Sequence, residues 1–202
     1  MSKKKTTRKT LDPKKLDFTS EEARKELKYE LRQQRTKRTF RSTVSILITA
    51  AAVAVLIANL YLPILHTYGT SMTPLLEEGD YTAAIRGSKF ETGDVIAFYY
   101  NNRILIKRVI AGPGDWVFID DDGVVSVNNE VIDEPYVSEL AKGDVTIELP
   151  YQVPEGRWFV LGDHREVSLD SRSKVIGDVA QEQVIGKLIG VVWPLEHMRL
   201  LS

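Results

Sequence analysis

The stretch VSILITAAAVAVLIANLYLPIL, residues 44–65, runs directly into HTYGTSMTP, residues 66–74, and these two segments set the architecture of the chain. No Asp, Glu, Lys or Arg occurs from Ser42 to Leu76. As a helix at about 1.5 Å per residue, the 22 apolar-rich residues would extend roughly 33 Å, which is enough to cross a hydrocarbon layer of about 30 Å. The sequence therefore predicts a membrane-spanning segment, with bounds at residues 42–66.

Two other interpretations of this segment are less consistent with its residues. A buried helix of a soluble protein would normally carry a polar face, and residues 44–65 show none. A cleaved secretory signal has a shorter apolar core and a small-residue cleavage site after it, which Leu60–Leu65 does not provide. We therefore expect an anchor that is not removed.

The charges of the chain are divided unevenly on the two sides of this anchor. Residues 1–41 hold 15 Lys and Arg against 6 Asp and Glu, and the remaining residues hold 12 against 22. Basic flanks resist translocation, which predicts a cytoplasmic amino terminus and an extracytoplasmic carboxyl terminus. We expect residues 1–41 to be disordered at first and then helical. A basic arm could instead bind nucleic acid, but its attachment to an apolar span favours the lipid bilayer as partner and no nucleic acid.

The part of the chain after the anchor has the pattern of an all-β domain. All 13 glycines lie at or after Gly69, and short apolar runs alternate with turn signals such as GPGD at residues 112–115. The expected strands are residues 81–86, 95–100, 104–110, 116–119, 124–127, 145–149, 158–161 and 183–193. This predicts a mostly β fold, an antiparallel sandwich or barrel-like domain over residues 67–202, with a small cap around residues 116–157.

The residue inventory limits the chemistry. The chain has no cysteine, so disulfides, thiolate metal sites and a cysteine nucleophile are excluded. Nothing in the sequence indicates a metal or an organic cofactor, or an oligomeric state. The three histidines, at positions 66, 164 and 197, do not suggest a Ser-His-Asp arrangement.

Ser71 and Lys107 are the candidate nucleophile and base. A serine hydroxyl needs a neighbouring base, and a lysine can serve only when it is neutral. Lys107 lies in ILIKRVI, residues 104–110, the most apolar setting of any lysine in the chain, and desolvation lowers a lysine pKa. Other roles are open at this point: Ser71 would also suit an ordinary turn, and Lys107 would suit an edge strand with its amine in solvent.

Four segments, in order behind the anchor, resemble the bacterial type I signal peptidases, membrane-bound serine proteases with a Ser/Lys dyad. The similar segments are GTSMTP at 69–74, FETGDVIAF at 90–98, IKRVIAGPGD at 106–115 and GDHR at 162–165 with SLDSR at 168–172. Residues 186–194 resemble the closing strand of the family, so the resemblance covers about residues 42–194. It implies an endopeptidase that removes signal peptides from exported precursor proteins at the cell membrane.

The resemblance also implies roles for individual residues. Ser71 would be the nucleophile, with its backbone N–H serving the oxyanion, and Lys107 would be the general base. Ser168 would hydrogen-bond to this lysine and orient it. The charged residues expected to brace the site as ion pairs are Arg108, Asp163, Asp170 and Arg172. The residues expected to bind substrate, at the pockets for small side chains at −1 and −3, are Gly69, Met72, Leu76 and Ile106.

The chain departs from the family pattern at four positions near these residues. Gly69 stands where some members have a serine that donates to the oxyanion, and Leu75, Leu105 and His164 replace a usual threonine, tyrosine and asparagine. None is the nucleophile or the base, so the departures concern pocket shape and specificity. An anchored, catalytically silent binding module stays as an alternative, as does a relative of the soluble self-cleaving repressors, which the membrane span disfavours.

Overall fold

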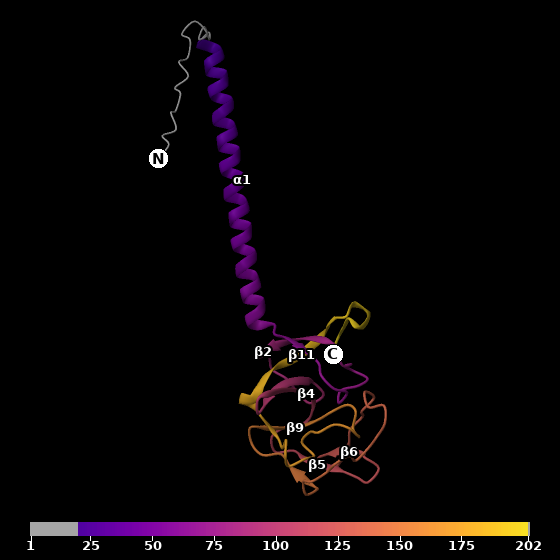
Figure 1. Ribbon diagram of the computed structural model, residues 1–202. Helices are drawn as coiled ribbons and strands as arrows, with labels where there is room; N and C mark the ends of the chain where they lie inside the picture. Colours follow the sequence, from indigo (N-terminus) through magenta and orange to yellow (C-terminus); the bar gives the residue numbers. More distant parts are fainter. Residues whose placement is uncertain (1–19, 202) are drawn as a thin grey trace, which may run out of the picture. The chain divides into compact units, whose positions relative to one another are not determined.

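The computed structural model describes residues 20–201, and these divide into two compact units, with the boundary between Ala54 and Val55. The predicted disorder of the first residues lies outside the described part of the chain. Figure 1 labels the helix and the main strands. The elements in chain order are α1 Ser20–Tyr61, β1 Ile64–His66, β2 Tyr81–Arg86, β3 Val95–Tyr100, β4 Arg103–Ala111, β5 Trp116–Ile119, β6 Val125–Val127, β7 Glu130–Val131, β8 Tyr151–Gln152, β9 Arg157–Leu161, β10 Val179–Ala180, η2 Gln181–Gln183, β11 Val184–Trp193, η3 Leu195–His197 and β12 Arg199–Leu200.

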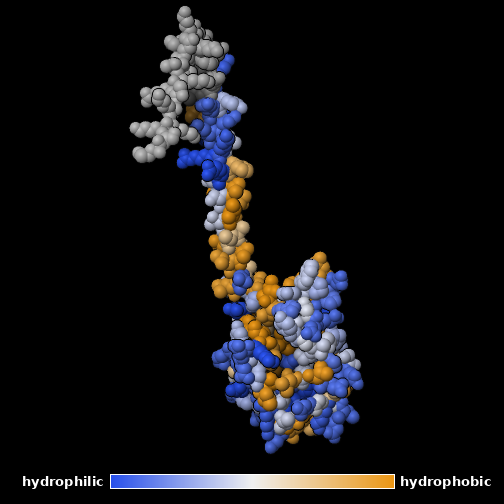
Figure 2. Space-filling view, in the orientation of Figure 1, coloured by the Kyte–Doolittle hydropathy of each residue, from blue (hydrophilic) through white to orange (hydrophobic). Residues whose placement is uncertain are grey.

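The first unit consists of the greater part of α1. Its surface changes from hydrophilic to hydrophobic along the helix (Figure 2). The stretch Lys28–Tyr61 is long and apolar enough, by length and composition, to cross a membrane, and its apolar window is not buried by the rest of the protein. The helix ends at Tyr61, four residues before the end predicted from the apolar run. Pro63 accounts for the difference, because a residue that precedes proline disfavours the helical conformation. The next three residues form strand β1 instead.

The second unit is built on one large antiparallel sheet. The strand order is β1-β2-β11-β3-β4-β9-β10, with β12 paired to β11. β3 and β4 form a continuous hairpin in which Ile96 pairs with Lys107 and Val95 with Arg108. β4 continues beyond this hairpin and pairs with β9 from Arg108 onward. The half of β4 between Arg103 and Lys107 therefore has a strand neighbour on only one side, which shapes the site described below.

A smaller sheet follows β4 in the chain. Its order is β7-β6-β5-β8, and all its pairs are antiparallel. It lies within the residues predicted to form a small cap. Its inward side chains, such as Val117, Ile119 and Val125, pack with Phe159 and Leu161 of β9. The two sheets thus share one apolar cluster, as the predicted mostly antiparallel β architecture requires.

The core of the large sheet contains two further clusters that lie on its two sides. Alternate residues of a strand face opposite sides, and β3 illustrates this. Val95 and Ala97 pack with Met72 and Leu76, whereas Ile96 and Phe98 pack with Val109 and Val160. Met72 belongs to the segment that carries Ser71, so burial of its side chain fixes that segment to the sheet.

Candidate active site

Ser71 lies in a tight turn between β1 and β2. The backbone N–H and the side-chain hydroxyl of Thr73 both donate to the carbonyl of Thr70, at 3.1 and 2.7 Å. Gly69 adopts φ = +77°, a left-handed conformation that costs a residue with a side chain about 1–2 kcal/mol. This backbone conformation favours glycine at position 69, where a serine would add a hydrogen-bond donor to the oxyanion.

The neighbouring loop fixes the turn from the other side. The backbone N–H of His164 donates to the carbonyl oxygen of Ser71 at 3.1 Å. The ring Nδ1 of His164 lies 3.0 Å from Oγ1 of Thr73 and 3.3 Å from the carbonyl oxygen of Thr70. A proton on Nδ1 suits both contacts, because a carbonyl oxygen only accepts and the Thr73 hydroxyl has the carbonyl of Thr70 as its own acceptor at 2.7 Å. His164, which stands where the family has asparagine, therefore acts here as a donor.

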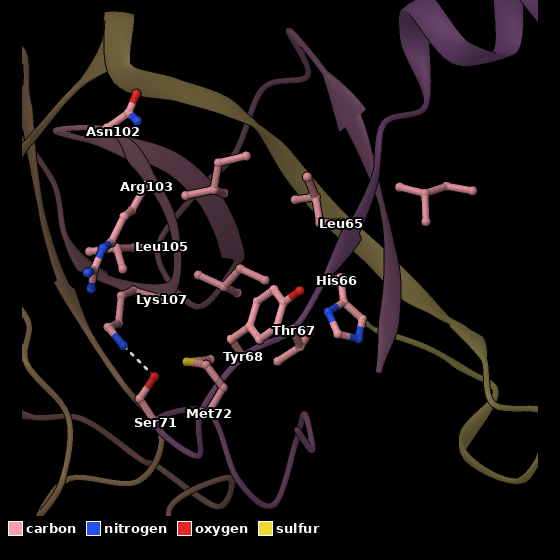
Figure 3. Close-up of a pocket in the computed structure, with 14 residues that line it drawn as sticks. Leu65, His66, Thr67, Tyr68, Ser71, Met72, Asn102, Arg103, Leu105 and Lys107 are labelled. Atoms are coloured by element: carbon pink, nitrogen blue, oxygen red, sulfur yellow. Dashed lines mark hydrogen bonds between the residues drawn. The ribbon is translucent and has the colours of Figure 1, made fainter. Parts of the chain in front are cut away.

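Lys107 reaches the same turn from strand β4. Its Nζ lies 2.6 Å from Oγ of Ser71, and the residue is only 3% exposed. Figure 3 marks this hydrogen bond with a dashed line. Burial lowers the pKa of Lys107 to about 8; Asp170 and Asp163 oppose this change and Arg172 adds to it. At pH 7.5, a pKa of about 8 leaves about a quarter of the amine neutral, against roughly 0.1% for an unperturbed lysine. The arrangement thus places a proton acceptor beside the Ser71 hydroxyl.

The structure pairs the four charged residues that the resemblance singled out. Arg108 donates to Asp163 through Nε at 2.9 Å and Nη2 at 2.6 Å. Arg172 donates to Asp170 in the same two-point manner, at 2.8 and 2.9 Å, and also to backbone carbonyls, including those of Arg165 and Ser168. All four residues are buried. Asp170 also accepts from the backbone N–H of Gly162 at 3.0 Å, so the second pair holds the loop that carries Ser168 and His164.

Ser168 does not make the predicted hydrogen bond to Lys107 in this structure. Its hydroxyl is buried and has no hydrogen-bond partner within the described residues. The Lys107 amine interacts with Ser71 instead, and the Ser168 side chain packs against Gly162. A Cβ at Gly162 would lie 2.2 Å from Oγ of Ser168 and 2.5 Å from the carbonyl oxygen of Ser71. The absence of a side chain at Gly162 is thus what allows these two serines to approach the same backbone.

A groove of about 690 Å³ leads away from Ser71 and Lys107 (Figure 3). One wall is formed by residues 64–69, and the other by residues 102–107. Three of the four predicted substrate-binding residues, Gly69, Met72 and Ile106, line it. The fourth, Leu76, does not: it is fully buried in the core with Met72 and Ala84. The backbone turns back on itself after Met72, with the N–H of Leu76 bonded to the carbonyl of Met72, and this directs Leu76 inward.

The two walls of the groove are open strand edges. The backbone N–H of Thr67 donates to the carbonyl of Asp80, the residue before β2. Because the peptide groups of successive strand residues point to opposite sides, those of Ile64, His66 and Tyr68 face the groove. On the other wall, the backbone N–H of Val109 donates to the carbonyl of Asp94, the residue before β3. The same alternation along β4 turns the peptide groups of Ile104 and Ile106 to the opposite side, toward the groove. A peptide in extended conformation can therefore add as a strand between the two edges.

A family model described as signal peptidase, peptidase S26, matches residues 40–193. The chain belongs to the signal peptidase family. It is 34% identical over 170 residues to the signal peptidase I of Bacillus licheniformis, covering 77% of this chain and 90% of that protein. It is 36% identical over 151 residues to the signal peptidase IB of Staphylococcus aureus strain Mu50, covering 65% of this chain and 78% of that protein. These relatives support signal peptidase I function.

A solved structure shares sequence with this chain as well. The chain in a crystal structure of a signal peptidase I from Enterococcus faecalis V583 is 32% identical in sequence to this chain. The alignment covers 50% of this chain and 97% of that chain, with a TM-score of 0.42. The matched region of the family model contains every residue of the site, from Gly69 to Arg172.

The structure also contains an ion pair that sequence reasoning missed. Arg165 donates to Glu134 through two nitrogens, at 3.0 and 2.5 Å, and its Nε donates to the carbonyl of Gly162. Tyr136, two residues beyond Glu134, lies 3.8 Å beneath the guanidinium of Arg108. The segment around residue 134 thus supports two arginines of the site. Glu134 is in irregular chain with no periodic pattern, so its sequence carries no signal of this role.

Proposed function

We propose that this signal peptidase is a membrane-anchored serine endopeptidase in which Ser71 is the nucleophile and Lys107 the general base. Its substrates would be exported precursor proteins that carry amino-terminal signal peptides. The observation that carries the proposal is the 2.6 Å approach of the Lys107 amine to the Ser71 hydroxyl in a buried setting that lowers the lysine pKa to about 8. Lowering the lysine pKa from 10.5 to about 8 costs the folded protein about 3 kcal/mol of stability. A purely structural lysine would gain nothing in return.

This geometry supports a two-step reaction through an acyl-enzyme. The neutral Lys107 amine accepts the Ser71 proton as Oγ attacks the scissile carbonyl, and the carbonyl oxygen takes the negative charge. Within residues 20–201 the backbone N–H of Ser71 donates to no protein acceptor, so it is free to stabilise this oxyanion. Lys107 then returns its proton to the leaving amine, which leaves an acyl group on Ser71. A water molecule, deprotonated by the same amine, releases that acyl group.

The remaining residues of the site support the two reacting side chains. The Arg108–Asp163 and Arg172–Asp170 pairs hold the strand of Lys107 and the loop of Ser168. We assign to the unpaired hydroxyl of Ser168 the role of accepting a hydrogen bond from the Lys107 ammonium once it has taken the proton. Gly69, Met72 and Ile106 would contact the substrate residues next to the scissile bond. Among residues 20–201, no group of three or more His, Asp or Glu side chains is placed so that it could hold a metal ion.

A membrane anchor close to Ser71 in the chain would suit an enzyme that acts on signal peptides. We propose that α1 crosses the cell membrane once, with the basic residues 1–41 in the cytoplasm and residues 67–202 outside. Ser71 follows the end of α1 by ten residues. A signal peptide is held in the bilayer by its own apolar segment, so its cleavage site emerges at the same surface.

The proposal is tested with the full chain in lipid vesicles and a precursor protein. Ser71→Ala should abolish processing while the protein stays folded, and Ser138→Ala, at an exposed serine of the cap, should process normally. Lys107→Arg should also be inactive, because arginine stays protonated and cannot accept the proton. A β-lactam-type acylating probe should attach to Ser71 and be found there by mass spectrometry. Unchanged processing by either variant would exclude that residue from the chemistry, and no processing by the unchanged chain would favour a non-catalytic binding module.

A further inference from the structure

The substrate groove contains one permanent positive charge and no carboxylate. Its lining from residues 64–72 and 102–107 includes no Asp or Glu, and its two cationic side chains are Lys107 and Arg103. Lys107 is buried and partly neutral. Arg103 is exposed and forms no salt bridge with any described residue. A fixed cation in a groove without carboxylates acts on the charge of the substrate residue that lies opposite it.

The position of Arg103 relative to the reacting groups is set by strand β4. Arg103, Leu105 and Lys107 lie on the same face, because side chains alternate along a strand. Figure 3 shows these three side chains in succession along β4, with Arg103 directed along the groove toward Lys107. Four strand residues correspond to about 13 Å. An extended peptide whose scissile carbonyl is at Ser71 therefore has its fourth or fifth residue from the cut beside the backbone of Arg103, within reach of the long Arg103 side chain.

The apolar lining decides which side of the scissile bond occupies this part of the groove. Ile64, Leu65 and Ile104 line the groove and precede Ser71 or Lys107 by three to seven residues along its two walls. In the chain, Ile64 follows the end of the candidate membrane span by only three residues. A signal peptide has its apolar segment before the cut, whereas the mature protein after the cut carries no such constraint. The residues upstream of the scissile bond therefore fit the groove that runs to Arg103.

We propose that Arg103 determines specificity by selecting precursors with an acidic residue at the fourth or fifth position before the cut, and by disfavouring lysine or arginine there. This rests on the proposed function and adds a charge preference to it. The contact is an ion pair at the rim of the groove, and it involves no covalent step. Arg103 acts on binding of the substrate and takes no part in proton transfer.

The test uses the full chain in micelles of a neutral detergent and a set of synthetic signal-peptide substrates. The peptides are identical except for a single Glu, Gln or Lys at the fourth or the fifth position before the cut. At low salt, kcat/KM should be higher for the Glu than for the Lys peptide by about two- to fivefold, the range expected for an exposed ion pair. Arg103→Gln should remove the preference and Arg103→Glu should reverse it. Arg86→Glu, at an exposed arginine of β2 outside the groove, is the matched control and should retain it.

The outcomes separate this inference from the function on which it rests. Cleavage of all peptides at equal rates by the unchanged enzyme, or the same preference in Arg103→Glu, would overturn the role of Arg103 and leave the peptidase assignment intact. Failure of the unchanged enzyme to cleave any of them would overturn both. If the charge-reversed variant does not fold, salt provides the second measurement, because 1 M NaCl should bring the Glu and Lys peptides to similar rates.

Discussion

The amine of Lys107 lies 2.6 Å from the hydroxyl of Ser71, and the two come from segments 36 residues apart in the chain. Lys107 is on a strand that pairs with β3, and Ser71 is on a turn held to the same sheet by buried Met72. The sheet thus sets the distance between the two groups before any substrate binds, and this preorganisation is what a general base requires.

The first prediction concerns the pH dependence of catalysis. Lys107 must be neutral to accept the Ser71 proton, and its pKa is lowered to about 8 by burial. Below this value the neutral fraction falls about tenfold per pH unit. We therefore expect kcat/KM for precursor cleavage to rise with pH, to bend near pH 8 and to level off above it. A profile that stays flat between pH 6.5 and 8.5 would exclude Lys107 as the base.

The second prediction concerns the stability cost of the same residue. The folded-state pKa of Lys107 lies below its unfolded value of 10.5, so between about pH 8 and 10.5 the unfolded chain binds more protons. Stability of the unchanged protein therefore rises with pH across this window. Lys107→Met should raise the free energy of unfolding at pH 7 by up to about 3 kcal/mol, and this gain should shrink toward pH 10.5.

Unfolding can be followed by tryptophan fluorescence, since all three tryptophans belong to the second unit, at positions Trp116, Trp158 and Trp193. Lys89→Met, at an exposed lysine, is the control and should leave the stability unchanged. A Lys107→Met variant that is less stable than the parent at pH 7 would show that the amine is a structural group.

Much of the fold was predictable because its strands are apolar runs between turn signals. The predicted bounds of β2, β3 and β5 are those observed, and the mostly antiparallel β class is confirmed. Strand β1 was missed because Ile64–His66 continues the apolar run of the helix, and only Pro63 marks the change. The strand predicted at residues 145–149 was wrong. Its backbone instead donates to the carbonyl of Arg172 from Thr146 and Ile147, a contact that sequence periodicity cannot reveal.

The site was predictable to the extent that its residues occur in recognisable segments. Those segments predicted Ser71 and Lys107 as the reacting residues, and the side chains of these two residues are in contact in the structure. They did not show that Leu76 is buried in the core, because the direction of its side chain depends on how the chain turns after Met72. The role of Arg103 follows only from the open edge of β4. Contacts between distant irregular segments, such as that of Glu134 with Arg165, have no counterpart in local sequence pattern.

The third prediction concerns His164, whose protonated Nδ1 contacts Thr73 and the carbonyl of Thr70. His164→Ala removes these contacts from the turn of the nucleophile, and a neutral hydrogen bond contributes about 0.5–1.5 kcal/mol, which corresponds to roughly a two- to tenfold loss. We expect this loss in kcat, with KM little changed. His164→Asn should restore most of the rate, because an asparagine amide can donate from nearly the position of Nδ1. Equal loss in both variants would show that only the volume of the ring matters.

The last prediction concerns Gly162, whose missing side chain allows Ser71 and Ser168 to approach the same backbone. A Cβ there would lie 2.5 Å from the Ser71 carbonyl oxygen and 2.2 Å from Oγ of Ser168, so Gly162→Ala must displace one or both. Overpacking of this kind costs about 1–3 kcal/mol of stability. Movement of the nucleophile turn by about 1 Å can reduce kcat by about a hundredfold.

Two further variants separate these effects. Gly112→Ala is the matched control, at a buried glycine where the nearest atom to an added Cβ is on the Trp158 side chain at 3.2 Å, and its kcat should be unchanged. Combining Gly162→Ala with Ser168→Gly removes the contact to Oγ but leaves the contact to Ser71. The double variant should therefore regain stability in thermal unfolding, but it should cleave the precursor more slowly than Ser168→Gly alone, because the contact to Ser71 remains. Cleavage by the double variant at the rate of Ser168→Gly would mean that the clash with Ser168, and not displacement of Ser71, caused the loss.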